Sequence, residues 1–128
     1  MRSRETLLRL HRFRTAEKRR QVADITFMIQ DFTRKFDELD AQVTFEETRT
    51  GVSDPSHFSY SLTAKSARAR RDNLMRSIAE LRDQQADAEA ALAAEEQDLR
   101  RAEMMAEKET QGSAPMAPAA AAAAPDMR

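Results

Sequence analysis

The positions of proline and glycine constrain this chain more than any other feature of its sequence. All four prolines and both glycines lie in two places, a central stretch around Gly51 and Pro55 and the C-terminal segment after residue 110. The two remaining segments, residues 1–50 and 62–110, contain no helix breaker and are rich in Arg, Glu, Ala, Leu, Gln and Met, which lose little side-chain freedom in a helix. We therefore predict two long helices.

Apolar residues in both segments recur with the period of a coiled coil. Their spacing alternates between three and four residues, which averages about 3.5 and marks a seam buried between two helices. A strand would need alternation every second residue, so no β-structure fits. The second seam has polar interruptions at Gln85 and Glu95. The predicted seam residues are Val22, Ile25, Ile29, Phe32, Phe36, Leu39 and Val43 in the first segment, and Leu74, Ile78, Leu81, Ala88, Leu92, Leu99 and Ala102 in the second.

The central stretch, residues 51–61, has the chemistry of a turn. Gly51 is a natural stop for the first helix, and the residues up to Pro55 favour a turn. We expect Phe58 and Tyr60 to close the open end of the seam. Beyond the second helix, residues 111–128 are rich in Ala and Pro and have almost nothing large and apolar to bury. We predict a disordered tail there.

Blocks of charge indicate how the two helices pair. Residues 1–20 carry eight Lys and Arg against two Glu, a net charge of +6, whereas residues 83–110 carry nine acids against three bases, a net charge of −6. Nearer the turn the signs reverse, with −4 over residues 31–47 and +4 over residues 63–79. Folding the chain back at residues 51–61 places each block beside its opposite.

The charge blocks and the apolar seam agree on one register, in which the residue numbers of facing pairs add up to about 110. Phe36 then faces Leu74. The predicted fold is all-α: a long two-helix antiparallel coiled-coil hairpin over residues 1–110 (helix 1–50, turn 51–61, helix 62–110), followed by a disordered tail over residues 111–128. An antiparallel dimer of hairpins and a swapped dimer would satisfy the same charge blocks.

At the terminal end the seam of the first helix becomes polar for three positions, Lys18, Thr15 and His11. Their partners in this register would be Leu92, Glu95 and Leu99. One interpretation is a loosely paired, fraying end, with the stem of Lys18 lying over Leu92. The other is that this end is held inside another protein, and that the basic residues on its outside form a docking surface. The residues of that surface are Arg9, Arg12, Lys18, Arg19 and Arg20.

Composition argues against several classes of function. A chain with no Cys and only His11 and His57 cannot build a standard zinc site, a thiol nucleophile or a disulfide framework. Two distant glycines form neither a phosphate loop nor a dinucleotide fingerprint. A hairpin offers no concave pocket to carboxylates, so we expect no enzyme, cofactor, metal or small-molecule substrate. The longest apolar run, Ala119–Ala124, is far short of the roughly 20 residues of a spanning helix and no signal peptide opens the chain, so we expect a soluble protein.

Several short motifs follow one another in a characteristic order. They are Arg2-Ser3-Arg4-Glu5 with Leu7-Leu8-Arg9-Leu10, Phe13, Glu17-Lys18-Arg19-Arg20-Gln21-Val22, Ile29, Gly51-Val52-Ser53-Asp54-Pro55 with His57-Phe58 and Tyr60, and Arg70-Arg71-Asp72-Asn73-Leu74. In this order, with the turn between the helices, residues 1 to about 106 resemble the FliJ family of bacterial flagellar type III export proteins, in its alphaproteobacterial form. Where enteric-type members have an aromatic-rich segment after the turn, this chain has Leu62-Thr63-Ala64-Lys65.

The resemblance implies a coiled coil similar to the central stalk of rotary ATPases, inserted in the hexameric flagellar export ATPase and touching the cytoplasmic domain of the export gate. It also implies the escort of empty export chaperones. The terminal end then enters the ATPase ring and the turn end points to the gate, which places the protein in the cytoplasm at the inner face of the cell membrane. The implied ATPase-binding residues are Arg9, Arg12, Lys18, Arg19, Arg20 and Gln21, and the implied gate-binding residues are Leu39, Val43, Phe58 and Tyr60.

Two other classes of function stay open. The first is a self-assembling cytoplasmic coiled-coil scaffold or adaptor with no ATPase partner. The second is binding of the basic first helix to acidic lipid or nucleic acid. That helix face lacks the Trp- and Phe-rich side of an interfacial helix and interleaved aromatics, and the acidic second helix offsets its charge. We therefore expect no nucleic-acid partner.

Overall fold

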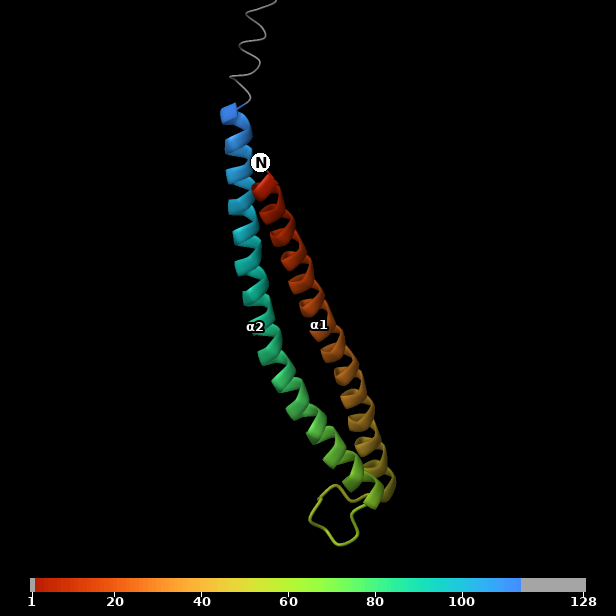
Figure 1. The fold of residues 1–128 in the computed structure, drawn as a ribbon. Coiled ribbons are helices and arrows are strands. Elements are labelled where there is room, and N and C mark those ends of the chain that lie inside the picture. The colour runs from red at the N-terminus through yellow and green to blue at the C-terminus, as the bar shows by residue number, and fades with distance from the viewer. Residues whose placement is uncertain (1, 114–128) are drawn as a thin grey trace, which may run out of the picture. The chain divides into compact units, whose positions relative to one another are not determined.

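The computed structural model describes residues 2–113, which form two long α-helices joined by a loop (Figure 1). Helix α1 spans Arg2–Thr50 and helix α2 spans Leu62–Ser113. The helices pack against each other, and no strand occurs in the described part of the chain, which confirms the predicted helical hairpin. Within residues 2–113, neither helix has a stretch apolar and long enough to cross a bilayer.

The contacts divide the chain into two compact units. Of the described residues, unit 1 combines 2–20 with 90–113, and unit 2 is the continuous stretch Gln21–Glu89. Each unit therefore contains a piece of α1 and a piece of α2. The loop belongs to unit 2.

The helix boundaries beside the loop follow from local backbone chemistry. Gly51 has a φ of 74°, a left-handed conformation that glycine adopts without strain, and its amide donates to the Glu47 carbonyl at 2.9 Å. Ser61 caps α2, because its Oγ accepts the Ala64 N–H at 3.1 Å and its carbonyl accepts the Lys65 N–H at 3.0 Å. These two caps place the loop over residues 51–61, as predicted.

Unit 2 contains the hydrophobic cluster of the hairpin. Leu39, Val43 and Ala67 are buried together, and the half-buried Leu74 packs against them. The predicted seam of this unit faces inward throughout: Ile29, Leu39, Val43 and Leu81 are buried, and Val22, Ile25, Phe32, Phe36, Leu74 and Ile78 are half-buried. Ala64 and Ala67 continue it toward the loop at 0% and 2% exposure, although the sequence analysis had not included them. At about 25 cal/mol per Å² removed from water, this burial is the main stabilising contribution.

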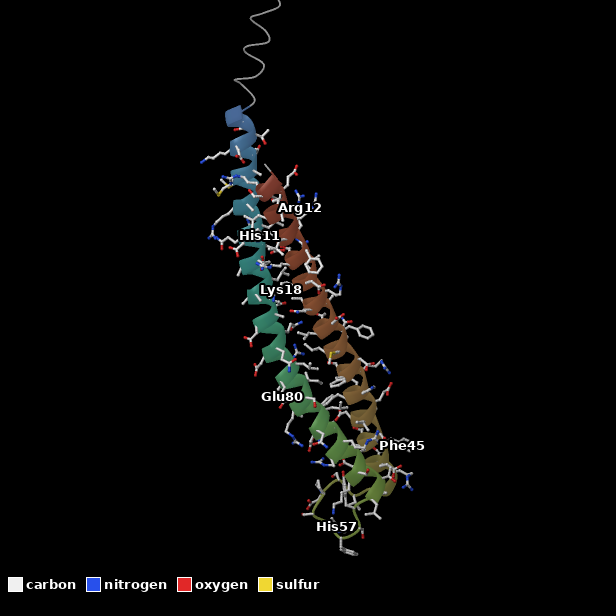
Figure 2. The ribbon with its side chains drawn as sticks, in the orientation of Figure 1. His11, Arg12, Lys18, Phe45, His57 and Glu80 are labelled. Atoms are coloured by element: carbon white, nitrogen blue, oxygen red, sulfur yellow. The ribbon has the colours of Figure 1, made fainter. Side chains whose placement is uncertain are left out.

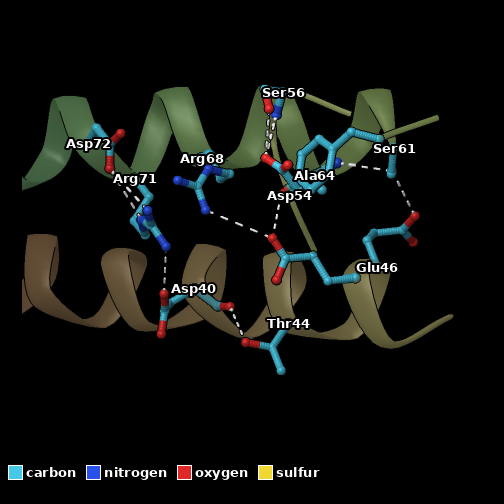
Figure 3. Close-up of polar contacts among 12 residues, drawn as sticks. Asp40, Thr44, Glu46, Asp54, Ser56, Ser61, Ala64, Arg68, Arg71 and Asp72 are labelled. Atoms are coloured by element: carbon cyan, nitrogen blue, oxygen red, sulfur yellow. Dashed lines mark hydrogen bonds and ion pairs between the residues drawn. The ribbon is translucent and has the colours of Figure 1, made fainter. Parts of the chain in front are cut away.

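Polar contacts between the helices of unit 2 keep the predicted register. Arg71 Nη1 lies 2.8 Å from Asp40 Oδ1, as Figure 3 shows, and Gln85 Nε2 donates to Thr26 Oγ1 at 3.0 Å. In both pairs the residue numbers add up to about the predicted 110. Exposed ion pairs contribute only about 0 to 1 kcal/mol each, so contacts of this kind select the alignment of the helices more than they stabilise it.

In unit 1 the first part of α1 runs antiparallel to the last part of α2. Arg4 pairs with Glu109 at 2.6 Å, and Arg19 pairs with Glu96 at 3.3 Å. Residue numbers rise along one helix as they fall along the other, as an antiparallel pair requires. Both pairs join the basic block of the sequence to its acidic block, as the charge pattern predicted.

Helix α2 continues past its predicted end. It ends at Ser113, so residues 111–113, which were assigned to the tail, are helical. A glycine in a helix costs only about 1 kcal/mol relative to alanine, and Gly112 therefore does not stop α2. Thr110 adds a bond within the helix, from its Oγ1 to the Ala106 carbonyl at 2.9 Å. The rest of the predicted tail, residues 114–128, lies outside the described residues.

Truncation of the hydrophobic cluster tests the origin of the stability. Leu39→Ala is expected to lower the free energy of unfolding by about 2 to 5 kcal/mol, because it removes buried apolar surface and leaves a cavity. The control is Phe45→Ala on the same helix, whose side chain is 64% exposed and projects away from α2 (Figure 2). Urea unfolding followed by circular dichroism should show a change near ±0.5 kcal/mol for the control. Equal losses in both variants would contradict the assignment of the core.

Candidate docking surfaces

Most of the basic residues predicted to bind the ATPase share one side of α1. At about 100° per residue, positions three, four and seven apart share a face of a helix. By this spacing Arg9, Arg12, Arg19 and Arg20 all lie within about 100° of one another around the helix axis. Lys18 belongs to the seam and is half-buried. We call the exposed members, Arg9, Arg12, Arg19 and Arg20, the basic surface of unit 1.

Two of these four arginines already have partners. Arg19 contacts Glu96 of α2 at 3.3 Å, and Arg20 contacts Glu17 one turn earlier at 2.8 Å. Arg9 and Arg12 are exposed and have no ion-pair partner among residues 2–113 (Arg12 is labelled in Figure 2). Within the basic surface, the charges that are not already engaged in ion pairs are therefore those of Arg9 and Arg12.

An exposed aromatic residue lies within the basic surface. Phe13 is 63% exposed, and it follows Arg9 by four positions on the same row as Ala16 and Arg20. The sequence analysis used Phe13 only as part of a motif and did not place it on a surface. The signal was present, however, because Phe13 is outside the 3.5-residue seam and a large apolar residue there must face solvent or a partner.

Gln21, the sixth residue predicted to bind the ATPase, is exposed. It belongs to unit 2, whereas the basic surface belongs to unit 1. The described contacts therefore assign Gln21 to a different unit from the four arginines.

The polar stretch of the seam in unit 1 is packed and hydrogen-bonded. Thr15 is fully buried, and its Oγ1 donates to the His11 carbonyl at 2.8 Å. His11 Nδ1 lies 3.2 Å from Glu95 Oε2, and both side chains are about 15% exposed. The imidazole is the donor, because an ionised carboxylate can only accept. Among the described residues no buried side-chain nitrogen or oxygen lacks a partner. Where a fraying end was one interpretation of the sequence, the structure has a packed polar layer whose buried groups are hydrogen-bonded.

The four residues predicted to bind the export gate differ in their accessibility. Leu39, Val43 and Tyr60 are only 3% to 8% exposed, because they belong to the core of unit 2. Phe58 is 95% exposed. Tyr60 therefore closes the seam as expected, whereas the same expectation was wrong for Phe58, which the loop turns outward. Of the four, Phe58 alone offers a fully accessible side chain.

Two glutamates at the end of α1 fix the loop end of unit 2. Tyr60 OH donates to Glu47 Oε2 at 2.5 Å, and Arg68 lies 3.8 Å from the same oxygen. Glu46 accepts hydrogen bonds from Arg49 at 2.8 Å and from Ser61 Oγ at 3.0 Å, the latter drawn in Figure 3. The bonds from Arg49 and then Ser61 lower the pKa of Glu46. The sequence analysis missed this role of the acidic pair.

Comparisons with known proteins leave the function undetermined. No model of a protein family, no curated protein and no solved structure matches this chain. The resemblance to the FliJ family therefore stays a hypothesis based on the motifs. Within residues 2–113, no three His, Asp or Glu side chains are grouped as metal ligands.

The ionisation of Tyr60 tests the packing of the loop end. Burial, and then the neighbouring Glu47, raise the pKa of Tyr60 above its ordinary value of 10.0. The neutral phenol is thus favoured in the folded chain, so Tyr60 stabilises the fold below pH 10 and this contribution is lost as pH rises through the higher folded pKa.

Tyr60 is the only tyrosine of the chain, so tyrosinate absorbance reports on it alone. The titration midpoint should lie above 10 in the folded protein and return to about 10 in denaturant. A folded midpoint at or below 10 would show that Tyr60 is not packed against Glu47.

Proposed function

We propose that this chain is a non-enzymatic stalk of a bacterial flagellar type III export apparatus. In this proposal unit 1 binds the hexameric export ATPase, and the loop end of unit 2 binds the cytoplasmic domain of the export gate at the inner face of the membrane. The escort of export chaperones belongs to the same proposal. The sequence motifs suggest these partners. The physical observation that carries the proposal is the pair of exposed, unpartnered arginines, Arg9 and Arg12, beside the exposed Phe13.

This combination of side chains suits a protein partner. Arginine and aromatic residues are enriched in protein interfaces, because a guanidinium binds carboxylates through two parallel hydrogen bonds and a ring supplies a large apolar contact. A partner surface with carboxylates around an apolar pocket would fit Arg9, Arg12 and Phe13. A polyanion such as nucleic acid is a poorer match, because it binds through many free cations. In unit 1, Arg4 and Arg19 already form ion pairs with carboxylates of α2.

The stalk needs no chemistry of its own. A ring subunit that changes shape with its nucleotide state would bind the basic surface more tightly in one state than in another. The coupling free energy is then the difference between those contact energies, and it acts in both directions between nucleotide and stalk. The arginines provide the charge-dependent part of this difference, and Phe13 provides the part that depends on apolar burial.

Charge reversal at the basic surface tests the proposal. Arg9→Glu combined with Arg12→Glu should weaken binding to the purified export ATPase hexamer by at least about tenfold, because the new carboxylates would repel the acidic groups that the arginines attract. The fold of unit 1 should be unchanged, because neither arginine makes an ion pair within its described residues. Binding is measured by titration, and circular dichroism checks that the variant remains helical.

The matched control is Arg100→Glu combined with Lys108→Glu, which makes the same change of charge on exposed residues of α2 in the same unit. The control should bind like the unchanged chain. Unaltered binding by the Arg9 and Arg12 variant, or an equal loss in the control, would contradict the assigned surface.

A self-assembling scaffold is the rival function, and exposed apolar residues in unit 1 favour it. Met104 and Met105 of α2 are 61% and 53% exposed. Light scattering over a range of concentrations separates the two functions. A stalk should be able to exist as a monomer, whereas a stable dimer or larger assembly that ignores the ATPase would favour the scaffold.

A further inference from the structure

The loop of unit 2 presents one large apolar side chain to solvent. Phe58 is 95% exposed, while Tyr60, two residues later, is buried at 8%. An exposed phenyl group does not gain the stabilising free energy of burial, roughly 25 cal/mol per Å² of apolar surface. Tyr60 shows that this loop can bury an aromatic ring. Phe58 is the most exposed of the large apolar side chains in the described part of the chain.

Hydrogen bonds give the loop around Phe58 a defined conformation. Asp54 Oδ1 accepts from the Ser56 amide at 3.0 Å and from the Ser56 hydroxyl at 2.8 Å, a pairing drawn in Figure 3. The Asp54 carbonyl accepts the His57 N–H at 3.0 Å, and the His57 carbonyl accepts the Tyr60 N–H at 3.0 Å. These are the local bonds by which an aspartate fixes a turn. The backbone on both sides of Phe58 is thus tied down.

His57 holds the ring of Phe58 in place. The two rings stack with their centroids 4.8 Å apart and their planes 21° from parallel. The imidazole is itself oriented, because its Nδ1 accepts the Ser59 N–H at 3.0 Å. Stacking of this kind is worth roughly 0.5 to 1.5 kcal/mol between aromatic pairs. Phe58 therefore stands outward beside His57, with nearly all of its surface exposed.

We propose that Phe58 is the anchor by which the loop of unit 2 inserts into an apolar pocket on a protein partner. The inference rests on the proposed contact with the export gate, and it narrows that contact to one side chain in place of the four residues first considered. An aromatic residue that is already oriented loses little conformational freedom on binding, so more of its burial energy contributes to affinity.

The charges of the loop indicate a protein pocket and not a membrane or a nucleic acid. Residues 51–61 contain no Lys or Arg, and Asp54 is their only acidic residue. Of the flanking cations, Arg49 pairs with Glu46 and Arg68 with Glu47, which leaves Lys65 as the nearby exposed cation. Binding to anionic lipid or to a phosphate backbone draws on cations near the contact. One phenyl group beside a carboxylate lacks that attraction, whereas an uncharged apolar pocket requires no cation.

The experiment measures binding of the full chain to the purified cytoplasmic domain of the export gate. Phe58→Ser should weaken binding at least about tenfold, and its fold should be unaffected because the side chain packs against little besides His57. Leu62→Ser is the matched control, since Leu62 is 81% exposed at the same end but follows the hydrogen-bonded loop. Asp54→Ala keeps the ring but removes the bonds to Ser56, and it should cause a smaller loss.

Each outcome bears on the proposal. No loss in Phe58→Ser, or an equal loss in Leu62→Ser, would overturn the anchor while leaving a gate contact intact. Binding of the unchanged chain to anionic lipid vesicles but not to the gate domain, with loss in Phe58→Ser, would replace the pocket with a membrane. If the unchanged chain binds neither, the anchor and the gate contact both fail, while the ATPase test with the Arg9 and Arg12 variant remains separate.

Discussion

Burial of a narrow apolar seam between two helices is the interaction on which the rest of this structure depends. In unit 2 the seam is apolar except at Gln85, and Leu39, Val43, Ala67 and Leu74 form its cluster. Because individual exposed ion pairs contribute only about 0 to 1 kcal/mol, the charge pattern acts on the direction and alignment of the helices. In unit 1 a hydrogen-bonded polar layer around the buried Thr15 replaces part of the seam. Stability and specificity therefore come from different parts of the sequence.

The same seam leaves most of each helix surface available for contacts with other molecules. In unit 1 the side of α1 away from the seam carries the unpartnered Arg9 and the exposed Phe13. At the loop, alternate residues have separate roles, since Tyr60 completes the core and Phe58 faces outward. A chain built this way exposes one set of side chains in unit 1 and another at the loop of unit 2. The proposed stalk function uses this property, because a stalk acts through contacts alone.

The apolar seam and the helix ends beside the loop were predictable from the sequence. The conformation of the loop and the partners of individual side chains were not. The seam and the loop boundaries follow from apolar spacing and from Gly51, a C-cap that the sequence shows directly. Phe58 faces outward in a loop that is held by hydrogen bonds of Asp54, and apolar spacing reveals neither feature. The register placed His11 opposite Leu99, but its imidazole instead reaches Glu95. Nor could the sequence show that Glu96 already pairs with Arg19, since exposed charges have many alternative partners.

The most direct test is an intramolecular distance between the basic first part of α1 and the acidic last part of α2. The chain has no cysteine, so Ala16→Cys and Ala94→Cys, both at exposed positions of unit 1, accept one spin label each. Double electron–electron resonance, with excess unlabelled protein to suppress signals between molecules, should give a distance on the order of 20 to 30 Å, set by neighbouring helix axes and the label arms. A distance beyond roughly 60 Å would mean that these two parts lie apart in one molecule, and it would contradict the antiparallel hairpin.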